Sequence, residues 1–334
     1  MTRINYEADL MREVLEYDER ENYLLMPNEV VSTLAKSDMF KGNKAQHVSV
    51  AYSYLYLNTW MYRYAKYSEV DLDITTVKGI KNLLGLSPTS VSYDYIFKKN
   101  GVLDELGLTK TVPFGQAPVQ WELLDDEMIE FQEFNELSED LKQVIVGDVS
   151  TRRRQIKYPV LAMEERNPLE DIEVNGTFYP AGKEFTHQIP FNAFMKCVTN
   201  EEIGTIGFYL YSFIRSRYGK NDSVQISLKT IARESGMSEK TVNTYMMALR
   251  EYGLMGVEVE DYVVGREMAE GLETKANRYW IIEEDFNHER EEVKIRRVTS
   301  VFKIEGVKFS AEAKIKRGEV FSEHRAKSNV KSLV

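Results

Sequence analysis

The chain has 334 residues, 43% of them hydrophobic and 29% charged, which is ordinary for a globular protein of about two domains. Its net charge of −10 argues against a general nucleic-acid coat protein, although a local surface can still bind specifically. The single cysteine, Cys197, excludes an intramolecular disulfide and is expected as a buried thiol. With neither a signal peptide nor a membrane-length apolar run, we expect a cytoplasmic protein without a membrane partner.

The N-terminal half predicts a helical segment over residues 1–22 and a winged-helix domain over 23–123. The recognition helix of this domain is expected to begin with Ser87 as N-cap and Pro88 at its first position. Val91 and Tyr95 then face inward. The outward positions and the two lysines that follow are candidate DNA contacts: Thr89, Ser92, Tyr93, Lys98 and Lys99.

The outward face of this first helix is comparatively apolar, because Tyr93 and Ile96 belong to it. The first domain therefore either contacts DNA weakly or offers a protein–protein surface, through which the chain could form a homodimer. The alternative is that both residues pack within their own domain. Residues 109–121, with Gly115 near the tip, are expected to form the wing.

An acidic linker is predicted over residues 124–175. Its three adjacent arginines, 152–154, can follow a phosphate backbone or pair with the acidic residues before them, and the second interpretation is slightly favoured. Residues 174–185 contain Asn-Gly and Ala-Gly turns typical of a small hairpin.

Residues 176–290 predict a second winged-helix domain, in which 224–254 form helix, tight turn and helix. Ser227 and Ser238 are natural N-caps, and Gly236 suits a positive-φ turn between them. The wing is expected over 257–282. The core face of the second helix comprises Val242, Tyr245, Met246 and Leu249. The candidate DNA contacts lie on or near the other face of this second helix, except Lys229, which is on the first: Lys229, Ser238, Lys240, Thr241, Asn243, Thr244, Met247 and Arg250.

A solvated surface helix has the same two faces, so the pattern alone leaves that alternative open. The basic tail over 291–334 alternates after Val293 and can add strands. The two halves also look duplicated, because aromatic segments 54–66 and 208–220 each precede a Gly-x-Ser turn. The predicted fold is therefore α+β, mainly α, with two tandem winged helix-turn-helix domains joined by the acidic linker.

Catalytic motifs are missing from the sequence. It has no phosphate-binding glycine loop, its four histidines lack metal-ligand spacing, and one cysteine cannot build a zinc ribbon. The many tyrosines are better explained as core residues than as nucleophiles. We expect no enzymatic activity, no metal and no cofactor.

Over residues 23–285 the chain resembles the replication initiators of theta-replicating bacterial plasmids and related phages. The resemblance is carried by the entries at Pro27 and Pro190, the two aromatic segments, and the turns at 85–87 and 236–238. It implies binding to repeated origin sites on double-stranded DNA and recruitment of host replication proteins. A transcriptional repressor of a mobile element is the alternative, and a non-enzymatic winged-helix interaction protein is a third.

Overall fold

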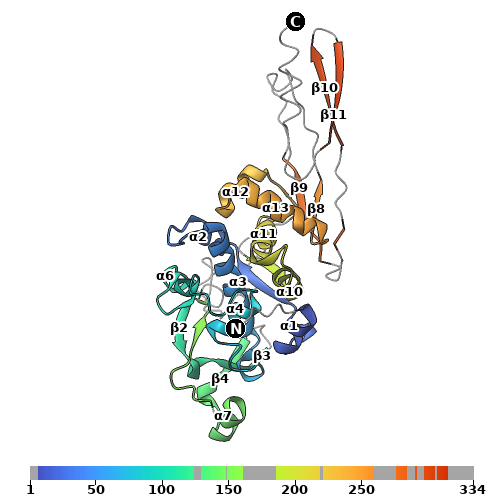
Figure 1. Cartoon of the computed structure of the whole chain (residues 1–334). Coiled ribbons are helices and arrows are strands. Elements are labelled where there is room, and N and C mark those ends of the chain that lie inside the picture. Colours follow the sequence, from blue (N-terminus) through green and yellow to red (C-terminus); the bar gives the residue numbers. More distant parts are fainter. Residues whose placement is uncertain are drawn as a thin grey trace, which may run out of the picture.

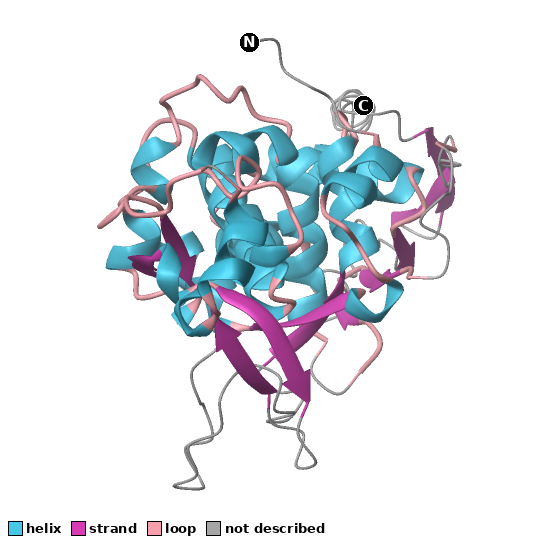
Figure 2. Ribbon diagram, turned by 90° about the horizontal axis from the view of Figure 1, so that it is seen from below, coloured by secondary structure: helices cyan, strands magenta, loops and turns pink. Residues whose placement is uncertain are grey.

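The computed structural model describes residues 7–123, 129–147, 149–160, 186–218, 221–258, 276–283, 290–291, 297–304 and 307–314. Over these residues the chain is α+β and mainly helical, with small antiparallel sheets. Figure 2 shows the helices gathered in one cluster, with paired strands at its border. The predicted class is confirmed at this level.

The first half begins with α1 in the N-terminal segment and is organised around the long helix α3 (Figure 1). Asn43 caps α3, which is buried from Val48 to Arg63. The helices and 3-10 turns are α1 (Ala8–Val14), η1 (Glu19–Glu21), α2 (Glu29–Lys36), α3 (Lys44–Arg63), η2 (Lys66–Ser68), α4 (Val77–Leu83), α5 (Asp94–Phe97), α6 (Val102–Glu105), η3 (Phe114–Gln116), η4 (Phe134–Glu136) and α7 (Glu139–Val146). The strands are β1 (Tyr23–Pro27), β2 (Lys110–Pro113), β3 (Pro118–Leu123), β4 (Ile129–Glu133) and β5 (Gln155–Tyr158).

The second half begins with a strand and a helix. The elements after them follow in the order helix, strand, helix, helix, strand, strand. Its helices are α10 (Phe191–Thr199), α11 (Gly204–Ser216), α12 (Leu228–Ser235) and α13 (Glu239–Glu251). Its strands are β6 (Thr186–Pro190), β7 (Val224–Gln225), β8 (Met255–Glu258) and β9 (Arg278–Ile281). The last three form one antiparallel sheet in the order β7-β9-β8. In the tail, β10 (Arg297–Ile304) pairs with β11 (Val307–Lys314), so the expected additional strands are present.

The two halves are joined by a sheet, because β1 pairs antiparallel with β6. The register sets Tyr23 opposite Pro190 and Pro27 opposite Thr186. Each strand ends at a proline and leads into a helix, α2 in one half and α10 in the other. The strands of the two predicted proline-led entries therefore pair with each other, and Pro27 and Pro190 lie at opposite ends of the pairing.

The prediction of a wing over residues 109–121 is wrong, because the two strands in this range, β2 and β3, do not pair with each other. β2 pairs with β5 and β3 pairs with β4. Lys157 on β5 donates to Asp104 at 2.6 Å, an ion pair that is nearly buried. Much of the acidic segment is thus folded onto the first half rather than acting as a linker. The predicted hairpin over 174–185 lies outside the described residues.

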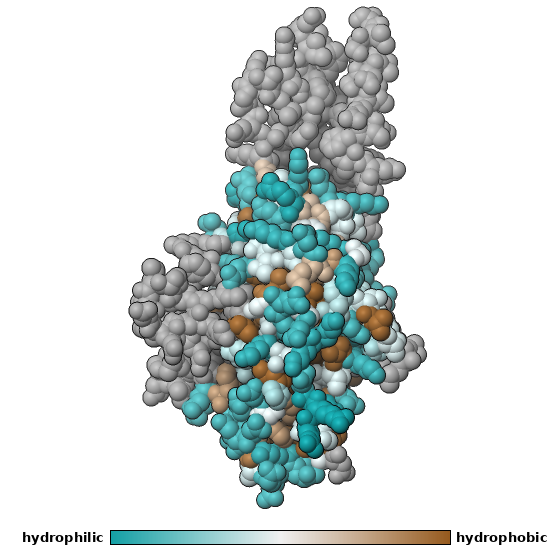
Figure 3. Space-filling model, turned by 90° about the vertical axis from the view of Figure 1, so that its left-hand side faces the viewer, coloured by the Kyte–Doolittle hydropathy of each residue, from teal (hydrophilic) through white to brown (hydrophobic). Residues whose placement is uncertain are grey.

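Among the described residues, which leave out 124–128 and 148, the arginines at 152–154 make none of the slightly favoured ion pairs with the acidic residues just before them. Arg154 donates to the Leu72 carbonyl oxygen at 2.7 Å and lies 3.4 Å from Asp73. Arg152 and Arg153 are exposed and form no ion pair within the described part of the chain. The side of the molecule shown in Figure 3 is mostly hydrophilic, with apolar residues in small separate patches.

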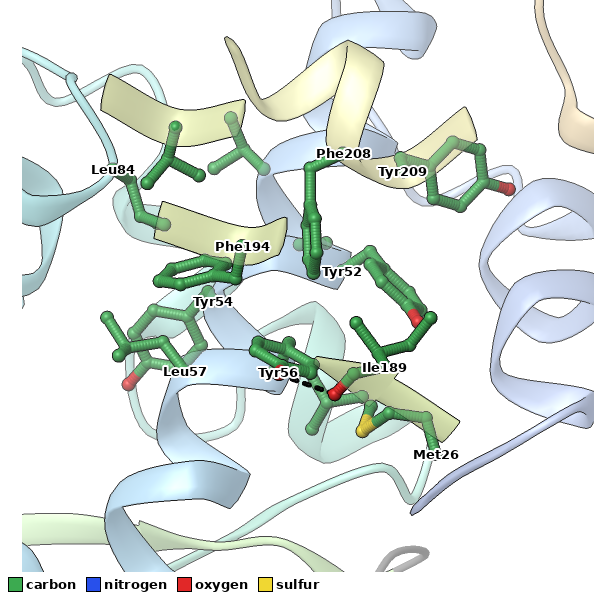
Figure 4. Packing of buried hydrophobic residues seen from close by; sticks show 14 of the residues in the cluster. Met26, Tyr52, Tyr54, Tyr56, Leu57, Leu84, Ile189, Phe194, Phe208 and Tyr209 are labelled. Atoms are coloured by element: carbon green, nitrogen blue, oxygen red, sulfur yellow. Dashed lines mark hydrogen bonds between the residues drawn. The ribbon is translucent and has the colours of Figure 1, made fainter. Parts of the chain in front are cut away.

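One aromatic core extends across both halves, centred where α3 packs against α10 and α11 (Figure 4). Trp60 stacks on Phe191 with ring centroids 4.0 Å apart. Tyr56 meets Phe208 edge-on at 5.0 Å, and its hydroxyl donates to the Ile189 carbonyl oxygen at 3.0 Å. Cys197 is buried, as expected. The tyrosines predicted to be core residues are indeed buried: Tyr52, Tyr54, Tyr56, Tyr62 and Tyr64.

His187 on β6 is a fully buried polar link between the halves. Its Nε2 lies 3.0 Å from the Tyr52 hydroxyl, and its Nδ1 lies 2.8 Å from Oδ1 of Asn28. Burial lowers the pKa of His187 to about 3, so the imidazole is neutral at physiological pH. The two halves therefore share both a hydrophobic core and a buried polar network.

Candidate nucleic-acid interface

α12 and α13 are positioned by two serine caps and one left-handed glycine. Oγ of Ser227 accepts the Thr230 N–H at 3.1 Å, and Oγ of Ser238 accepts the Thr241 N–H at 3.1 Å. Between the helices, Gly236 has a φ of 73°. The predicted caps and the positive-φ turn are confirmed.

The inner faces of these helices are anchored in the core. Val242, Met246 and Leu249 are buried, as predicted, whereas Tyr245 is only half-buried. The Tyr209 hydroxyl, on α11, lies 3.3 Å from the Ser235 carbonyl oxygen and 3.5 Å from that of Val31. The end of α12 is thereby attached to both α11 and α2.

The outer face of α13 is polar and available. Lys240 and Thr244 are exposed, and Asn243 is half-buried beside them. None of these three side chains makes a hydrogen bond or an ion pair among the residues that the structure describes. Met247 continues the same face, one turn after Asn243 and Thr244. This face can offer one cation, one amide and one hydroxyl to a ligand.

Three other predicted contacts already have partners within the protein. The hydroxyls of Ser238 and Thr241 lie 2.8 Å apart at the start of α13, where they cap it. Arg250 is half-buried, and its Nη1 donates to Sδ of Met247 at 3.3 Å. Burial lowers the pKa of Arg250. These side chains stabilise the helix, and their contact with DNA stays a prediction.

Ion pairs reduce the positive field around α12 and α13. Arg217 and Arg233 both pair with Glu234, at 2.9 and 3.1 Å. Lys229, near the N-terminus of α12, is exposed like Lys240, and neither has an ion pair within the described residues. The usable cations of this surface are therefore fewer than the sequence indicated.

The predicted first recognition helix is wrong. Residues 87–93 form turns and irregular structure, and the next helix, α5, has only four residues. Val91, expected inside, is 77% exposed, while Ile96, expected outside, is fully buried. Ile96 therefore cannot form the predicted protein–protein surface, and a homodimer through that face loses its main apolar contact.

One remaining candidate of the first half, Tyr93, belongs to a small aromatic cluster. The Tyr93 ring packs on His47 with centroids 4.9 Å apart. The Tyr95 hydroxyl lies 2.7 Å from Nδ1 of His47 and accepts the Lys41 N–H at 2.9 Å. The predicted contacts nearby in sequence are exposed: Thr89, Ser92, Lys98 and Lys99.

His47 and Lys41 were missed by the sequence prediction because they lie more than 45 positions before the tyrosines that they contact. Lys41 is exposed, and its Nζ lies 5.2 Å from the centre of the Tyr95 ring. Together these residues make a second surface that is cationic and aromatic, built from the start of α3, from α5 and from the residues just before each helix.

No family model matches the chain, and neither the curated proteins nor the solved structures contain a significant match. Among the described residues, no helix is both long and apolar enough to cross a membrane, and no His, Cys, Asp and Glu side chains cluster as metal ligands would.

Proposed function

We propose that the chain is a sequence-specific double-stranded DNA-binding protein, with α13 as its recognition helix. The observation that carries the proposal is the outer face of α13. Lys240, Asn243 and Thr244 project from a helix that is rigidly capped and anchored, and they have no partner among the described residues. Asn can pair with adenine edges, and Lys can meet guanine edges or phosphate.

The surrounding topology supports a winged-helix domain in the second half. Helix α11, strand β7, helices α12 and α13, and the β8–β9 hairpin follow in the order of that fold. The hairpin pairs Val257 with Tyr279 and would serve as the wing. Residues 259–275, which would include its tip, lie outside the described residues.

The first half supports binding in a different manner. It shares the strand, helix, helix entry with the second half, as β1-α2-α3 beside β6-α10-α11, but it lacks a recognition helix among its described residues. Lys41, Lys98 and Lys99 are exposed near Tyr93 and Tyr95, and lysines suit phosphate contacts. We assign this surface to the DNA backbone rather than to base reading.

Binding can be tested with the full chain and a pool of random duplex DNA. Enrichment of one sequence motif is expected, with loss of that preference in a K240A/N243A/T244A variant. Lys78, an exposed lysine on α4, offers a matched control, and K78A should bind as the unmodified chain does. Failure to enrich any motif, or equal binding by the triple variant, would contradict the proposal.

The biological role we propose is initiation of plasmid or phage replication, which rests on the resemblance of the paired entries and Gly-x-Ser turns. A transcriptional repressor would use the same face of α13. The two roles separate in a maintenance assay, in which the gene and its flanking DNA are placed on a replicon lacking any other initiator. Stable maintenance that the triple variant abolishes supports initiation, whereas no maintenance with intact DNA binding supports the repressor.

A further inference from the structure

The chain after the proposed wing is fastened to Glu251, the last residue of α13. Arg290 donates through Nε and Nη2 to one carboxylate oxygen of Glu251, at 3.2 and 3.0 Å, and through Nη1 to Glu202 at 3.0 Å. The Glu291 N–H donates to the Glu251 carbonyl oxygen at 2.8 Å. β10 begins at Arg297, six positions later, and six residues of chain span at most about 20 Å. The ribbon formed by β10 and β11 is therefore tethered close to the proposed recognition helix.

The register of the β10–β11 ribbon separates its residues by charge. Residues alternate between the two faces along each strand, and residues opposite each other in the register share a face. One face comprises Val298, Ser300, Phe302 and Ile304 of β10 with Val307, Phe309, Ala311 and Ala313 of β11. The other comprises Arg297, Thr299, Val301 and Lys303 of β10 with Lys308, Ser310, Glu312 and Lys314 of β11. The first face has no charged residue, whereas the second has four cations and a single acid.

The cations of the second face lie opposite one another in pairs. Arg297 is the register partner of Lys314, and Lys303 is the register partner of Lys308. Like charges directly opposite each other destabilise a sheet, so an anion that lies over each pair stabilises the ribbon. The two pairs are six positions apart along β10, which corresponds to about 20 Å. One small anion cannot cover both pairs, whereas the successive phosphates of a nucleic acid can.

We propose that these four cations, which we call the ribbon face (Arg297, Lys303, Lys308 and Lys314), bind the phosphate backbone of the duplex that α13 reads. The ribbon contact rests on the proposed function of α13 and adds to it contacts that carry no sequence information. Figure 1 shows β10 and β11 beyond β8 and β9, at the end of the molecule that carries α12 and α13. Ion pairs with Glu234 use two arginines near α12, and the ribbon face supplies cations that this surface lacks.

Neutralisation of the ribbon face in the full chain tests the contact. R297Q/K303Q/K308Q/K314Q should bind both the enriched duplex and random duplex at least about tenfold more weakly in about 0.1 M salt. Each lost phosphate contact lowers the salt slope by about 0.9, so the slope should fall by about 3 to 4. The preference for the enriched motif should remain, because α13 is unchanged. K240A/N243A/T244A should show the reverse, with the preference lost and most of the salt slope kept.

The results distinguish the ribbon from α13. Unchanged affinity and salt slope in the quadruple variant would overturn the ribbon contact and leave the role of α13 intact. An unmodified chain without a preferred motif, whose binding still falls in the quadruple variant, would contradict the role of α13 instead. Binding of anionic lipid vesicles that the quadruple variant loses, with DNA binding unchanged, would assign the ribbon face to a membrane and overturn the proposal.

A matched pair of substitutions tests the face itself. Ser310 shares the face of the four cations, whereas Ser300 belongs to the uncharged face. Ser310→Lys should strengthen binding to all duplexes and increase the salt slope by about 0.9. Ser300→Lys makes the same change in net charge and should leave the slope as it is in the unmodified chain. A gain in binding cannot result from misfolding, and equal effects of the two variants would overturn the proposal.

Discussion

Gly236, in the turn before α13, lies against Ala35 at the end of α2. A Cβ added to Gly236 would lie 3.1 Å from the Ala35 carbonyl oxygen and 3.4 Å from its Cα. The turn that orients the proposed recognition helix is thus held by the first half of the chain. Folding of the first half is therefore expected to influence the orientation of the proposed recognition helix.

Gly236→Ala is expected to lower the free energy of unfolding by more than the roughly 1 kcal/mol that a left-handed φ alone costs a residue with a Cβ. Gly107 provides the matched control, because its φ is 69° and an added Cβ would meet nothing within 4 Å. Gly107→Ala should show the backbone cost only. Denaturant unfolding of both variants measures the difference, and equal losses would mean that the Ala35 contact is unimportant.

Asn243→Ala and Lys240→Ala should weaken DNA binding in different ways. Loss of a base contact at Asn243 is expected to cost about 1–3 kcal/mol on the preferred sequence and little on other sequences. Loss of a phosphate contact at Lys240 should weaken binding to all sequences and reduce the salt slope by about 1. Titrations at several salt concentrations, with specific and random duplexes, distinguish the two. Identical effects of both variants would contradict the assigned roles.

His187 should make the protein less stable in mild acid. Its folded pKa is lowered to about 3 by burial, whereas the unfolded imidazole has a pKa of about 6.5. Below pH 6.5 the unfolded state binds a proton that the folded state does not bind. The free energy of unfolding therefore decreases as the pH is lowered, by about 2 kcal/mol between pH 7 and pH 5. Unfolding of His187→Gln at both pH values should show a smaller pH dependence, and an unchanged dependence would exclude His187 as its source.

Lys157→Met should be strongly destabilising, because it leaves Asp104 without its cation in a site that is only 11% exposed. Breaking a buried pair in this way costs about 3–5 kcal/mol. Lys110, on the strand that pairs with β5, is exposed, so Lys110→Ala should change stability little. A small effect of Lys157→Met in denaturant unfolding would mean that β5 contributes little to the first half.

The two Gly-x-Ser turns show where sequence prediction succeeds and where it fails. Ser238 caps α13 as predicted, and the residues after it keep helical geometry. Ser87 and Pro88 carry an equally good start signal, yet turns follow them. There, the buried Ile96 and the bonds of the Tyr95 hydroxyl to Lys41 and His47 hold the segment in another conformation. A local signal cannot reveal partners so distant along the chain.

By itself, the sequence determined the features that depend on near neighbours: the caps at Ser227 and Ser238, the left-handed Gly236 and the polar outer face of α13. Only the tertiary structure decided which strands pair, that β5 belongs to the first half, and that β1 and β6 unite both halves around one core. The reason is the range of the interactions. Capping and helical periodicity act over about four positions, whereas β1 and β6 are joined across more than 150 residues of chain.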